Sequence, residues 1–447
     1  MANTVAKYQK YAEYQDSGVV WMGNVPIHWT CERFKWLLTE KLKTSNPDLP
    51  AGSISFGEVI YKNEVNLSPD TKASYQEVLK DEFLINPLNL NYDLKSLRTA
   101  LSKIDVVVST GYIVLHCDQS LDKNYVRWLL QEFDVAHMKT LGAGVRQTVN
   151  FSDIANCYFY LPDHVEQIQI ANFLDHETTQ IDTLIAKQEK LIELLKEKRQ
   201  AVISHAVTKG LNPDAAMKDS GVEWLGKVPE HWEVRQLRYL GSCQNGINIG
   251  AEYFGSGSPF ISYGDVYRNP ELPSVFEGLV QSTENDKRIY SVQRGDVLFT
   301  RTSETIEEIG FSSTCLTDVK DATFAGFLIR FRPIQNTLLP EYSKFYFRNI
   351  LLRAFFVKEM NLVTRASLSQ ELLKKLAVPF SSLEEQKQIA DFLSAKERVF
   401  DKLVNDCIKQ IELLKERRTA LISSAVTGKI NVSNWQHPNE AKTELSL

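Results

Sequence analysis

The stretch DHVEQIQIANFLDHETTQIDTLIAKQEKLIELLKEKRQAVISHAVTKG, residues 163–210, decides the fold because the chain contains it twice. Its second copy, SLEEQKQIADFLSAKERVFDKLVNDCIKQIELLKERRTALISSAVTGK, covers residues 382–429 and aligns without a gap at an offset of 219. We call these stretches the helix motifs. Each begins with the pattern of a capping box, Asp163 to Glu166 and Ser382 to Glu385, in which the first side chain caps a helix and the fourth reaches back.

Apolar residues recur at helical spacing along both helix motifs, which indicates a stripe that is buried lengthwise. They are Ile181, Leu184, Ile185, Leu191, Ile192, Leu195, Val202 and Ala206 in the first motif, and Phe400, Leu403, Val404, Ile411, Leu414, Leu421 and Ala425 in the second. A continuous helix over residues 166–207 would be roughly 60 Å long at about 1.5 Å per residue. We therefore predict two long helices that pack along each other.

A shorter repeat lies ahead of each helix motif. The stretch DSGVVWMGNVPIHW, residues 16–29, returns as DSGVEWLGKVPEHW, residues 219–232, and ten of the fourteen positions are identical. We call these stretches the frame motifs. Two kinds of motif in the same order in both halves indicate an internal duplication with a period of about 200 residues.

The segments between the frame and helix motifs differ from each other in sequence. Both contain short β-branched and aromatic runs separated by Gly, Asn and Pro, such as residues 104–117 (IDVVVSTGYIVLHC) and 295–301 (GDVLFTR), which are typical of strands. Helical stretches, residues 121–133 and 338–356, are interspersed. We predict an α+β protein with two mixed α/β, strand-rich domains.

Composition excludes several classes of protein. The chain has 447 residues, 43% of them hydrophobic and 24% charged, which is typical of a soluble protein of several domains. There is no signal peptide and no apolar run near about 18 residues, so we expect a cytoplasmic protein with no membrane contact. The six cysteines form no CxxC pair and the histidines no HExxH, so we expect buried thiols and no metal site.

Motifs for catalysis are also missing. The sequence has no FxGxG and [NDS]PP[YF] pair for adenine methylation, no GxxxxGK[ST] loop and no GxSxG elbow. The nearest match, FGSGSPF at residues 254–260, has each glycine one residue too early for the FxGxG spacing and one proline instead of two. We interpret it as a Gly/Ser turn, and we predict a chain that is not an enzyme and takes no cofactor.

The repeated DSGVxWxGxVPxHW, each time followed by a variable domain, EQxxIAxFL and a helix ending in IELLKExRxAxISxAV, resembles the specificity subunit of type I DNA restriction-modification systems. The resemblance covers residues 16–430. Residues 295–301 look like a strand and loop that recur in the family, and DEFLINPLNLN, residues 81–91, looks like their counterpart in the first domain. Each domain then reaches its helix through a similar segment, GVRQTVNFSDI or VTRASLSQEL.

The resemblance implies two target recognition domains that each read one half of a bipartite double-stranded DNA site. It also implies an antiparallel two-helix coiled coil as spacer, two docked modification (methyltransferase) subunits, and restriction/translocase subunits that join this core. The expected divisions are an N-terminal segment with the first frame motif (1–29), the first recognition domain (30–162), the central helix (163–210), the second frame motif (211–232), the second recognition domain (233–381), the C-terminal helix (382–430) and a tail (431–447).

Base edges are read by forked donors and amides, with Arg favoured for guanine and Asn or Gln for adenine. The loop-prone candidates for DNA contact are Asn89, Asn91, Arg98, Lys103, Ser109, Tyr112 and Arg146 in the first domain, and Tyr263, Arg268, Arg301, Thr302, Ser303, Thr364 and Arg365 in the second. The alternatives for each are an exposed charge, a phosphate contact or a helix cap. Asn150 and Ser369 are expected to cap helices.

The aromatic residues of the frame motifs leave two interpretations open. Trp21, Trp29, Trp224 and Trp232 either pack against the helix ends or form part of a partner-docking surface. No carboxylate is repeated beside His28 and His231, so we expect structural imidazoles. The net charge of −5 argues against DNA binding by bulk charge and favours the alternative function, a non-catalytic coiled-coil scaffold or protein-binding adaptor.

Overall fold

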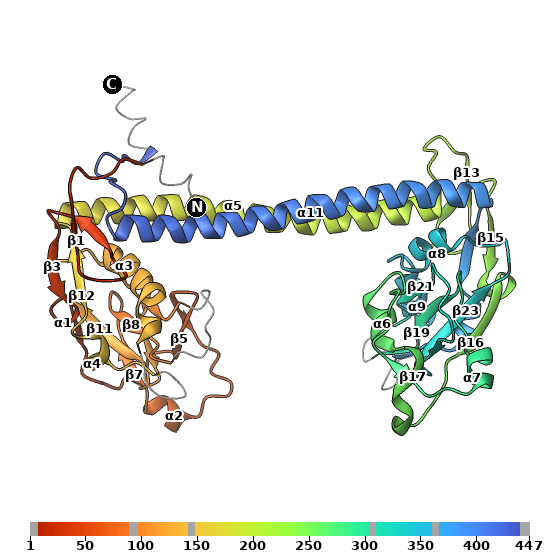
Figure 1. The fold of residues 1–447 in the computed structure, drawn as a ribbon, viewed down its shortest axis with the longest axis horizontal. Coiled ribbons are helices and arrows are strands. Elements are labelled where there is room, and N and C mark those ends of the chain that lie inside the picture. Colours follow the sequence, from red (N-terminus) through yellow and green to blue (C-terminus); the bar gives the residue numbers. More distant parts are fainter. Residues whose placement is uncertain (1–7, 89–96, 142–147, 304–308, 360–365, 439–447) are drawn as a thin grey trace. The chain divides into compact units, whose positions relative to one another are not determined.

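The computed structural model describes residues 8–88, 97–141, 148–303, 309–359 and 366–438 of the chain (Figure 1). It forms two compact units, each of which is described by itself. The first unit contains residues 1–188 and 409–447, and the second contains residues 189–408. Helices α5 (His164–Lys209) and α11 (Leu383–Val426) each contribute residues to both units.

The first unit is built around a six-stranded sheet. Its strands, in spatial order, are β4 (Leu38–Glu40), β11 (Ile113–Cys117), β8 (Phe83–Ile85), β9 (Thr99–Leu101), β6 (Glu58–Tyr61) and β5 (Gly52–Ser55). Neighbouring strands are antiparallel except β6 and β9. A separate pair, β7 (Gln76–Val78) and β10 (Val106–Val108), carries the valine run of the predicted strand at residues 104–117.

Helix α3 (Lys123–Ala136) links this sheet to the core of the first unit. Asp122 caps the helix by accepting the backbone N–H of Tyr125 at 2.8 Å. The buried face of α3 includes Phe133, whose ring centroid lies 4.9 Å from that of Phe159 and 5.9 Å from that of Phe34. The short helices of this unit are α1 (Phe34–Leu37), α2 (Pro69–Ala73), η2 (Met138–Thr140) and α4 (Phe151–Ile154).

The second unit contains a four-stranded antiparallel sheet. Its spatial order is β16 (Gly241–Asn245), β23 (Leu328–Pro333), β19 (Val297–Thr300) and β21 (Ser312–Thr314). A smaller sheet has the order β18 (Leu279–Val280), β17 (Phe254–Ile261) and β22 (Thr323–Phe324). The prediction of a Gly/Ser turn at residues 254–260 is wrong, because these residues form β17, with a bulge between Phe254 and Ser258 that accommodates the glycines.

Helices cover the four-stranded sheet of the second unit. The helices of this unit are η3 (Leu237–Tyr239), η4 (Ala251–Tyr253), α6 (Tyr263–Arg268), α7 (Glu284–Ile289), α8 (Pro340–Phe347), α9 (Leu352–Glu359) and α10 (Gln370–Lys374). The hydrophobic core joins Phe299 and Phe331 of the sheet to Phe347 of α8. The predicted helical stretch at residues 338–356 is therefore confirmed, as two helices rather than one.

The two sheets share a strand order that the divergent sequences do not reveal. The neighbouring strands are β4, β11, β8 and β9 in the first unit and β16, β23, β19 and β21 in the second. In both sets the spatial order is the first, fourth, second and third strand of the set along the chain. In both units a strand after the frame motif also pairs with the strand that leads into a long helix. These pairs are β3 (Thr30–Arg33) with β12 (Tyr158–Leu161), and β15 (Glu233–Gln236) with β25 (Ala377–Phe380).

The frame motifs take the same local structure in both units. Each forms a small hairpin with the residues before it, β1 (Tyr14–Asp16) with β2 (Asn24–Pro26) and β13 (Met217–Asp219) with β14 (Lys227–Pro229). The first aspartate of each motif accepts the N–H of the glycine two residues later, at 3.0 Å for Asp16 and 2.9 Å for Asp219. This Asx turn starts the loop in both copies.

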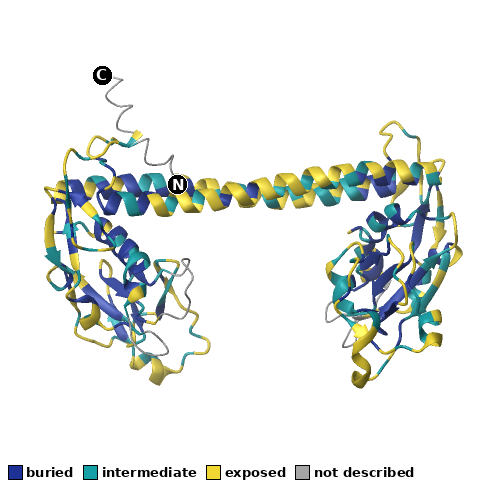
Figure 2. Ribbon diagram, in the orientation of Figure 1, coloured by how far each residue is buried: buried dark blue, intermediate teal, exposed yellow. Residues whose placement is uncertain are grey.

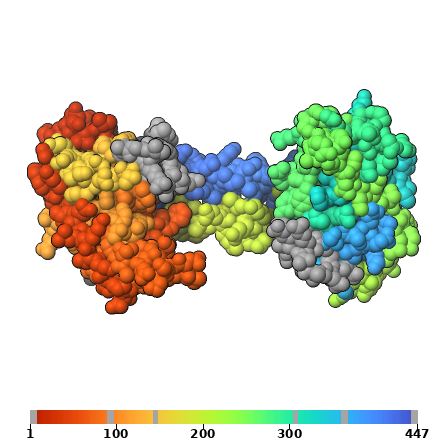
Figure 3. Space-filling model, turned by 90° about the horizontal axis from the view of Figure 1, so that it is seen from below, coloured from red at the N-terminus to blue at the C-terminus, as the bar shows by residue number. Residues whose placement is uncertain are grey.

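Helices α5 and α11 run antiparallel within each unit, and Figures 1 and 3 show them side by side. In the first unit Asp182 pairs with Arg418 at 2.9 Å, and the side-chain Nε2 of Gln188 donates to Oε1 of Gln410 at 2.8 Å. In the second unit Arg199 of α5 pairs with Asp401 of α11. The two long helices predicted from the helix motifs are confirmed.

The apolar stripe of these helices is wider than the contact between them (Figure 2). Ile181, Ile411 and Leu421 are buried. Leu184 is 47% exposed, and Leu191 and Leu403 are each 43% exposed. The prediction that the whole stripe is buried is therefore wrong, because one neighbouring helix covers only a narrow seam.

Candidate functional site

The frame motif and the helix motif meet in a cluster of three side chains in the first unit. The imidazole Nε2 of His28 lies 2.9 Å from Oε2 of Glu166, and the indole Nε1 of Trp29 donates to Oε1 of Glu166 at 3.3 Å. Glu166 is held here because its backbone N–H is capped by Asp163 at 2.9 Å, which fixes the first turn of α5. We call this trio the first frame cluster.

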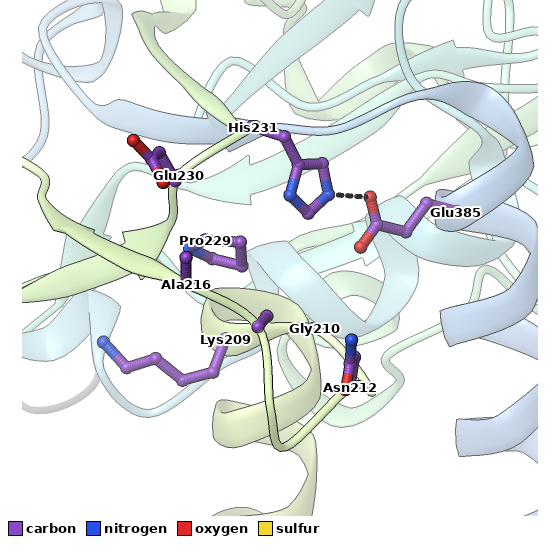
Figure 4. A pocket seen from close by; sticks show the side chains of 9 residues that line it. Lys209, Gly210, Asn212, Ala216, Pro229, Glu230, His231 and Glu385 are labelled. Atoms are coloured by element: carbon purple, nitrogen blue, oxygen red, sulfur yellow. Dashed lines mark hydrogen bonds and ion pairs between the residues drawn. The ribbon is translucent and has the colours of Figure 1, made fainter.

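The second unit repeats the cluster with the equivalent residues. Nε2 of His231 lies 3.0 Å from Oε2 of Glu385, and Nε1 of Trp232 donates to the same oxygen at 2.8 Å. Ser382 caps the backbone N–H of Glu385 at 3.2 Å. Figure 4 shows the imidazole of this second frame cluster directed at the carboxylate.

These clusters correct two predictions. The first residue of each predicted capping box does cap its helix, but the glutamate does not reach back to it, because its carboxylate accepts hydrogen bonds from the frame motif. His28 and His231 also have a carboxylate partner in both units. Sequence analysis missed it because the glutamates lie 138 and 154 residues further along the chain.

The glutamine after each glutamate makes a second matched set of contacts. The side-chain amide of Gln167 donates to Pro162 O at 3.0 Å, and its carbonyl accepts the N–H of Asp122 at 2.9 Å. Gln386 donates to Ser381 O at 3.1 Å and accepts the N–H of Leu339 at 2.9 Å. The glutamine therefore ties the start of each long helix to the residue that caps α3 or α8.

In each unit the C-terminal end of one long helix lies beside the cluster at the start of the other long helix. Gly210, just after α5, has a φ of +73°, and a Cβ there would lie 3.5 Å from the Trp232 ring. Gly428, just after α11, has a φ of +71°, and a Cβ there would lie 2.4 Å from Pro26. Glycine is required at both positions by the left-handed backbone, and at Gly428 also by the close approach.

The tryptophans of the frame motifs are covered by their own units. Trp29 is 3% exposed and Trp232 is fully buried. The ring of Trp21 lies 5.4 Å from that of Phe159, and the ring of Trp224 lies 6.3 Å from that of Phe355. Trp29 and Trp232 therefore lie against the first turns of the long helices, whereas Trp21 and Trp224 pack against rings of their own domains. A partner-docking role for the four rings stays a prediction.

In both domains the backbone just after a central strand, β8 or β19, is hydrogen-bonded to the segment that leads to the long helix. In the first domain the N–H of Val149 donates to Pro87 O at 3.1 Å. In the second domain the N–H of Leu368 donates to Arg301 O at 2.7 Å, and β20 (Thr302–Ser303) pairs with β24 (Ala366–Ser367). In each domain, two segments that hold predicted DNA-contact residues are therefore joined by backbone hydrogen bonds at their bases. We call these joined bases the loop stems.

Several candidates for DNA contact are close in sequence to these stems. Asn89, Asn91, Arg146, Thr364 and Arg365 lie outside the described residues. Arg301 and Thr302 lie at the stem in the second domain and are half-buried, and Ser303 follows them in β20. Asn150 and Ser369, at the N-caps of α4 and α10, confirm the prediction that they cap helices.

Arg98 differs from its expected place on a surface loop. Only 4% of it is exposed, and both its backbone N–H and its Nε donate to the carboxylate of Asp134 at 2.8 Å. It therefore anchors β9 to α3 instead of offering its guanidinium to a ligand. Lys103 is mostly exposed and lies 3.4 Å from Glu58.

The turn from Ser109 to Tyr112 is held from inside the first domain. The buried side-chain amide of Gln76 donates to Ser109 O at 3.2 Å and to Tyr112 O at 2.7 Å. Burial raises the pKa of the Tyr112 hydroxyl. Lys43, which sequence analysis did not single out, donates to Thr110 O at 2.9 Å and adds a positive charge at this turn.

The remaining candidates lie on α6 of the second domain. Tyr263 is half-buried and stacks on Tyr267 with ring centroids 5.8 Å apart. Arg268 is exposed and its Nε donates to Gly264 O at 3.2 Å. Arg348 fixes α6 by donating to Tyr267 O at 2.7 Å, and burial lowers the pKa of its guanidinium.

No group of three or more metal-ligating side chains occurs among the described residues. No helix in that part of the chain is long and apolar enough to cross a membrane. All six cysteines are free thiols, but only Cys315 and Cys407 are buried, and Cys31 is exposed. The prediction that all the thiols are buried is therefore wrong.

Comparison with known families gives relatives for the second half of the chain. The family described as the type I restriction modification DNA specificity domain matches residues 229–413, from the second frame motif into α11. This chain is a relative of type I specificity subunits. The resemblance recognised from the frame and helix motifs is confirmed.

The curated relatives are specificity subunits of type I restriction enzymes. The putative type I restriction enzyme MjaX specificity subunit of Methanocaldococcus jannaschii is 28% identical over 49% of this chain and 50% of the relative. The type I restriction enzyme EcoKI specificity subunit of Escherichia coli K12 is 25% identical over 62% of this chain and 59% of the relative. The chain thus spans between half and three fifths of the length of these relatives.

Two solved structures share the fold. One belongs to a study of complex assembly and conformational transition of the type I R-M system, with a TM-score of 0.67 at 14% identity, covering 90% of this chain and 98% of that one. The other is the HsdS subunit from Thermoanaerobacter tengcongensis, with a TM-score of 0.54 at 14% identity, covering 91% and 98%. At this identity the likeness establishes the mixed helix and strand fold.

Proposed function

We propose that this chain is the non-catalytic DNA-recognition subunit of a type I restriction-modification complex in a prokaryotic cytoplasm. Each of its two domains reads one half of a bipartite double-stranded site. One observation carries the proposal. The two domains have the same strand order and the same pairing of loop stems, but the residues at these loops differ.

The loops have the chemistry for local base reading. Arg301 and Thr302 lie at the loop stem of the second domain, and the sequence of the first domain places Asn89 and Asn91 just beyond its own stem. Arginine and asparagine form the paired hydrogen bonds that distinguish guanine and adenine in the major groove. Such contacts need only a few donors, so they are compatible with the net charge of −5.

Helices α5 and α11 serve as the spacer between the readers in this proposal, as an antiparallel coiled coil formed from an internal duplication. Half-sites on one face of B-DNA recur at about 34 Å, so the readers need a stiff connection. The antiparallel pairing of the helices in each unit supports this role. Four residues inserted after Leu195 should change the preferred gap or abolish activity, and an unchanged site with full activity would count against the spacer.

The partners in this proposal are two modification subunits, one for each frame and helix motif, together with the restriction/translocase subunits. The exposed leucines of the long helices support a docking role. Leu184 and Leu413 in the first unit are 47% and 64% exposed, and Leu194 and Leu403 in the second are 48% and 43% exposed. The proposal assigns these leucines to the surface that receives the modification subunits.

A domain exchange tests the proposed function. Residues 30–162 are replaced by the equivalent domain of a relative with a different target, and the methylated sequence is mapped in cells that hold the modification subunit. We expect one half of the methylated sequence to change and the other half to stay. A change in both halves would contradict the reading of one half-site by each domain.

A protein-binding scaffold is the alternative that the net charge favours. The same cells decide between the two functions. Purification of the tagged chain with a methyltransferase subunit in a ratio of one to two supports the DNA-recognition subunit. Purification without it, together with an unmodified genome, supports the scaffold.

A further inference from the structure

A pocket of about 420 Å³ opens beside the second frame cluster (Figure 4). The end of α5, the linker after it, the frame motif and the start of α11 line it, through Gly210, Asn212, Ala216, Pro229, His231 and Glu385. All of these residues belong to the second unit.

In the first unit the same place is filled by a tyrosine. The hydroxyl of Tyr11 donates to Oε1 of Glu166 at 2.5 Å, and its ring centroid lies 5.5 Å from that of His28 and 6.4 Å from that of Trp29. Burial and the hydrogen bond to Glu166 raise the pKa of this hydroxyl, so it stays a donor at neutral pH. The first frame cluster is thus completed by its own chain.

Backbone hydrogen bonds fix which residues correspond in the two units. The N–H of Ile27 donates to Glu13 O at 3.3 Å, and the N–H of Glu230 donates to Ala216 O at 2.7 Å. In this register the residue at the place of Tyr11 is Asp214, and it is exposed. A carboxylate cannot replace a phenol beside Glu385, because the two like charges would repel each other.

The second frame cluster also keeps an unused acceptor. His231 and Trp232 both contact Oε2 of Glu385. Within the described residues, Oε1 of Glu385 accepts no hydrogen bond, whereas Oε1 of Glu166 accepts from both Trp29 and Tyr11. The pocket therefore has space of about 420 Å³ beside a carboxylate oxygen that could accept a hydrogen bond from an occupant.

The surroundings of one phenylalanine also differ between the two units, and the difference favours an aromatic occupant beside the second frame cluster. In the first unit the buried ring of Phe173 lies 5.3 Å from the ring of Tyr8 and 5.7 Å from that of Trp435. Its counterpart Phe392 is only half-buried and lines a second pocket, of about 350 Å³. Leu211, also on this pocket, stands where the first unit has Tyr8.

We propose that the pocket at Glu385 receives a tyrosine side chain from a partner protein. The phenol donates to Oε1 of Glu385 and the ring lies against His231, as Tyr11 does in the first unit, while a second aromatic side chain covers Phe392. The assignment of this partner to the modification subunit rests on the proposed function. The two docking places are then unequal, because Tyr11 already occupies the one in the first unit.

The first experiment tests the pocket without any partner. A peptide with the chain's own sequence YQKYAE, residues 8–13, and a terminal diazirine is photolysed with the full chain, and the labelled residues are mapped by mass spectrometry. We expect labels in residues 209–216 and 229–231. A peptide with phenylalanine at the second tyrosine loses a hydrogen bond to a charged acceptor, so its label should fall by about 10-fold or more.

Matched variants of the chain serve as controls. His231→Ala removes a ring whose side chain is 62% exposed, so the fold is retained, and it should lower the label several-fold. His28→Ala changes the equivalent ring in the unit that Tyr11 already fills, and it should leave the label unchanged. Equal labelling by the tyrosine and phenylalanine peptides, or equal effects of the two variants, would overturn the pocket.

The second experiment tests the partner. Excess modification subunit is added before photolysis and should abolish the label in residues 209–216. If the label persists although the subunit is bound, the assignment to this partner is overturned, and the tyrosine pocket stands. Neither result depends on the methylation map, so failure of this proposal is distinguishable from failure of the proposed function.

Discussion

The two units of this chain build the same cluster from equivalent residues but complete it differently. In the first unit, Tyr11 supplies the last donor to Glu166, and Tyr8 and Trp435 cover Phe173. In the second, Oε1 of Glu385 accepts no hydrogen bond from the part of the chain that the structure describes, and Phe392 is half-buried. The difference teaches that a repeated scaffold does not imply repeated surfaces, because the residues that flank the repeats decide what remains open.

The largest expected effect on stability comes from the buried tryptophan that both frame clusters contain. Trp29→Ala and Trp232→Ala each remove a buried indole and its hydrogen bond to a glutamate. We expect each to lower the free energy of unfolding of its own unit by about 3–5 kcal/mol. Hydrogen exchange of α3 for the first unit and of α8 for the second measures this. A loss below about 1 kcal/mol at either site would show that the two clusters are not equivalent.

The next effect tests the asymmetry directly. Tyr11→Phe keeps the ring but removes the hydrogen bond to the carboxylate, and we expect a loss of about 1.5–3 kcal/mol in the first unit. Asp214→Asn, at the equivalent exposed position, should stay within about 0.5 kcal/mol. Urea unfolding of both variants provides the comparison, and similar losses would remove the distinction between the units.

A third difference concerns pH. Buried Glu132 of α3 hydrogen-bonds Ser423 of α11 in the first unit, and in the second unit Asn349 accepts from Ser204 of α5 at 2.6 Å. Burial raises the pKa of the Glu132 carboxyl. Its contribution to stability is therefore complete below the pKa of the unfolded chain, near 4.5, and is lost as the pH rises through the higher folded pKa.

Glu132→Gln should remove this pH dependence from the first unit. At pH 7 we expect a melting temperature higher by roughly 2–4 °C, as for about 1 kcal/mol in a unit of this size. Asn349→Asp places a carboxyl at the equivalent buried position, so it should introduce the same loss of stability with rising pH into the second unit. Melting curves between pH 4 and pH 8 check both variants, and parallel curves for wild type and Glu132→Gln would argue against this role of the carboxylate.

The smallest expected effect lies between the long helices. Arg418→Ala removes the pair with Asp182 in the first unit, and Arg199→Ala removes the pair with Asp401 in the second. Both acidic partners are more than half exposed, so each loss should stay within about 1 kcal/mol and shrink further in high salt. Thermal unfolding at low and high salt measures it. A large, salt-independent loss would mean that the helices depend on these pairs.

Local signals predicted the secondary structure well. Helical spacing of apolar residues identified α5 and α11, and β-branched runs identified β10, β11 and β19. These elements depend on neighbouring residues, so a short window of sequence contains the information. The capping roles of Asp163 and Ser382 were predictable for the same reason.

Long-range contacts were not predictable from the sequence. Nothing near His28 shows that its partner is Glu166, and nothing in the two divergent domains shows that their sheets share a strand order. Arg98 looked like a loop residue because its acidic partner, Asp134, belongs to a distant helix. The one available signal was the glutamate–glutamine pair that both helix motifs place in the first helical turn.

The division of the chain between the units has a consequence for biosynthesis. The second unit is one uninterrupted segment, residues 189–408, whereas the first also needs residues 409–438, including Gly428 against Pro26 and Trp435 against Phe173. On the ribosome, the half that emerges first therefore waits with part of its core uncovered until the last residues are translated. A message truncated near its 3′ end would leave the first-made unit incomplete, although every residue of the second unit had been synthesised.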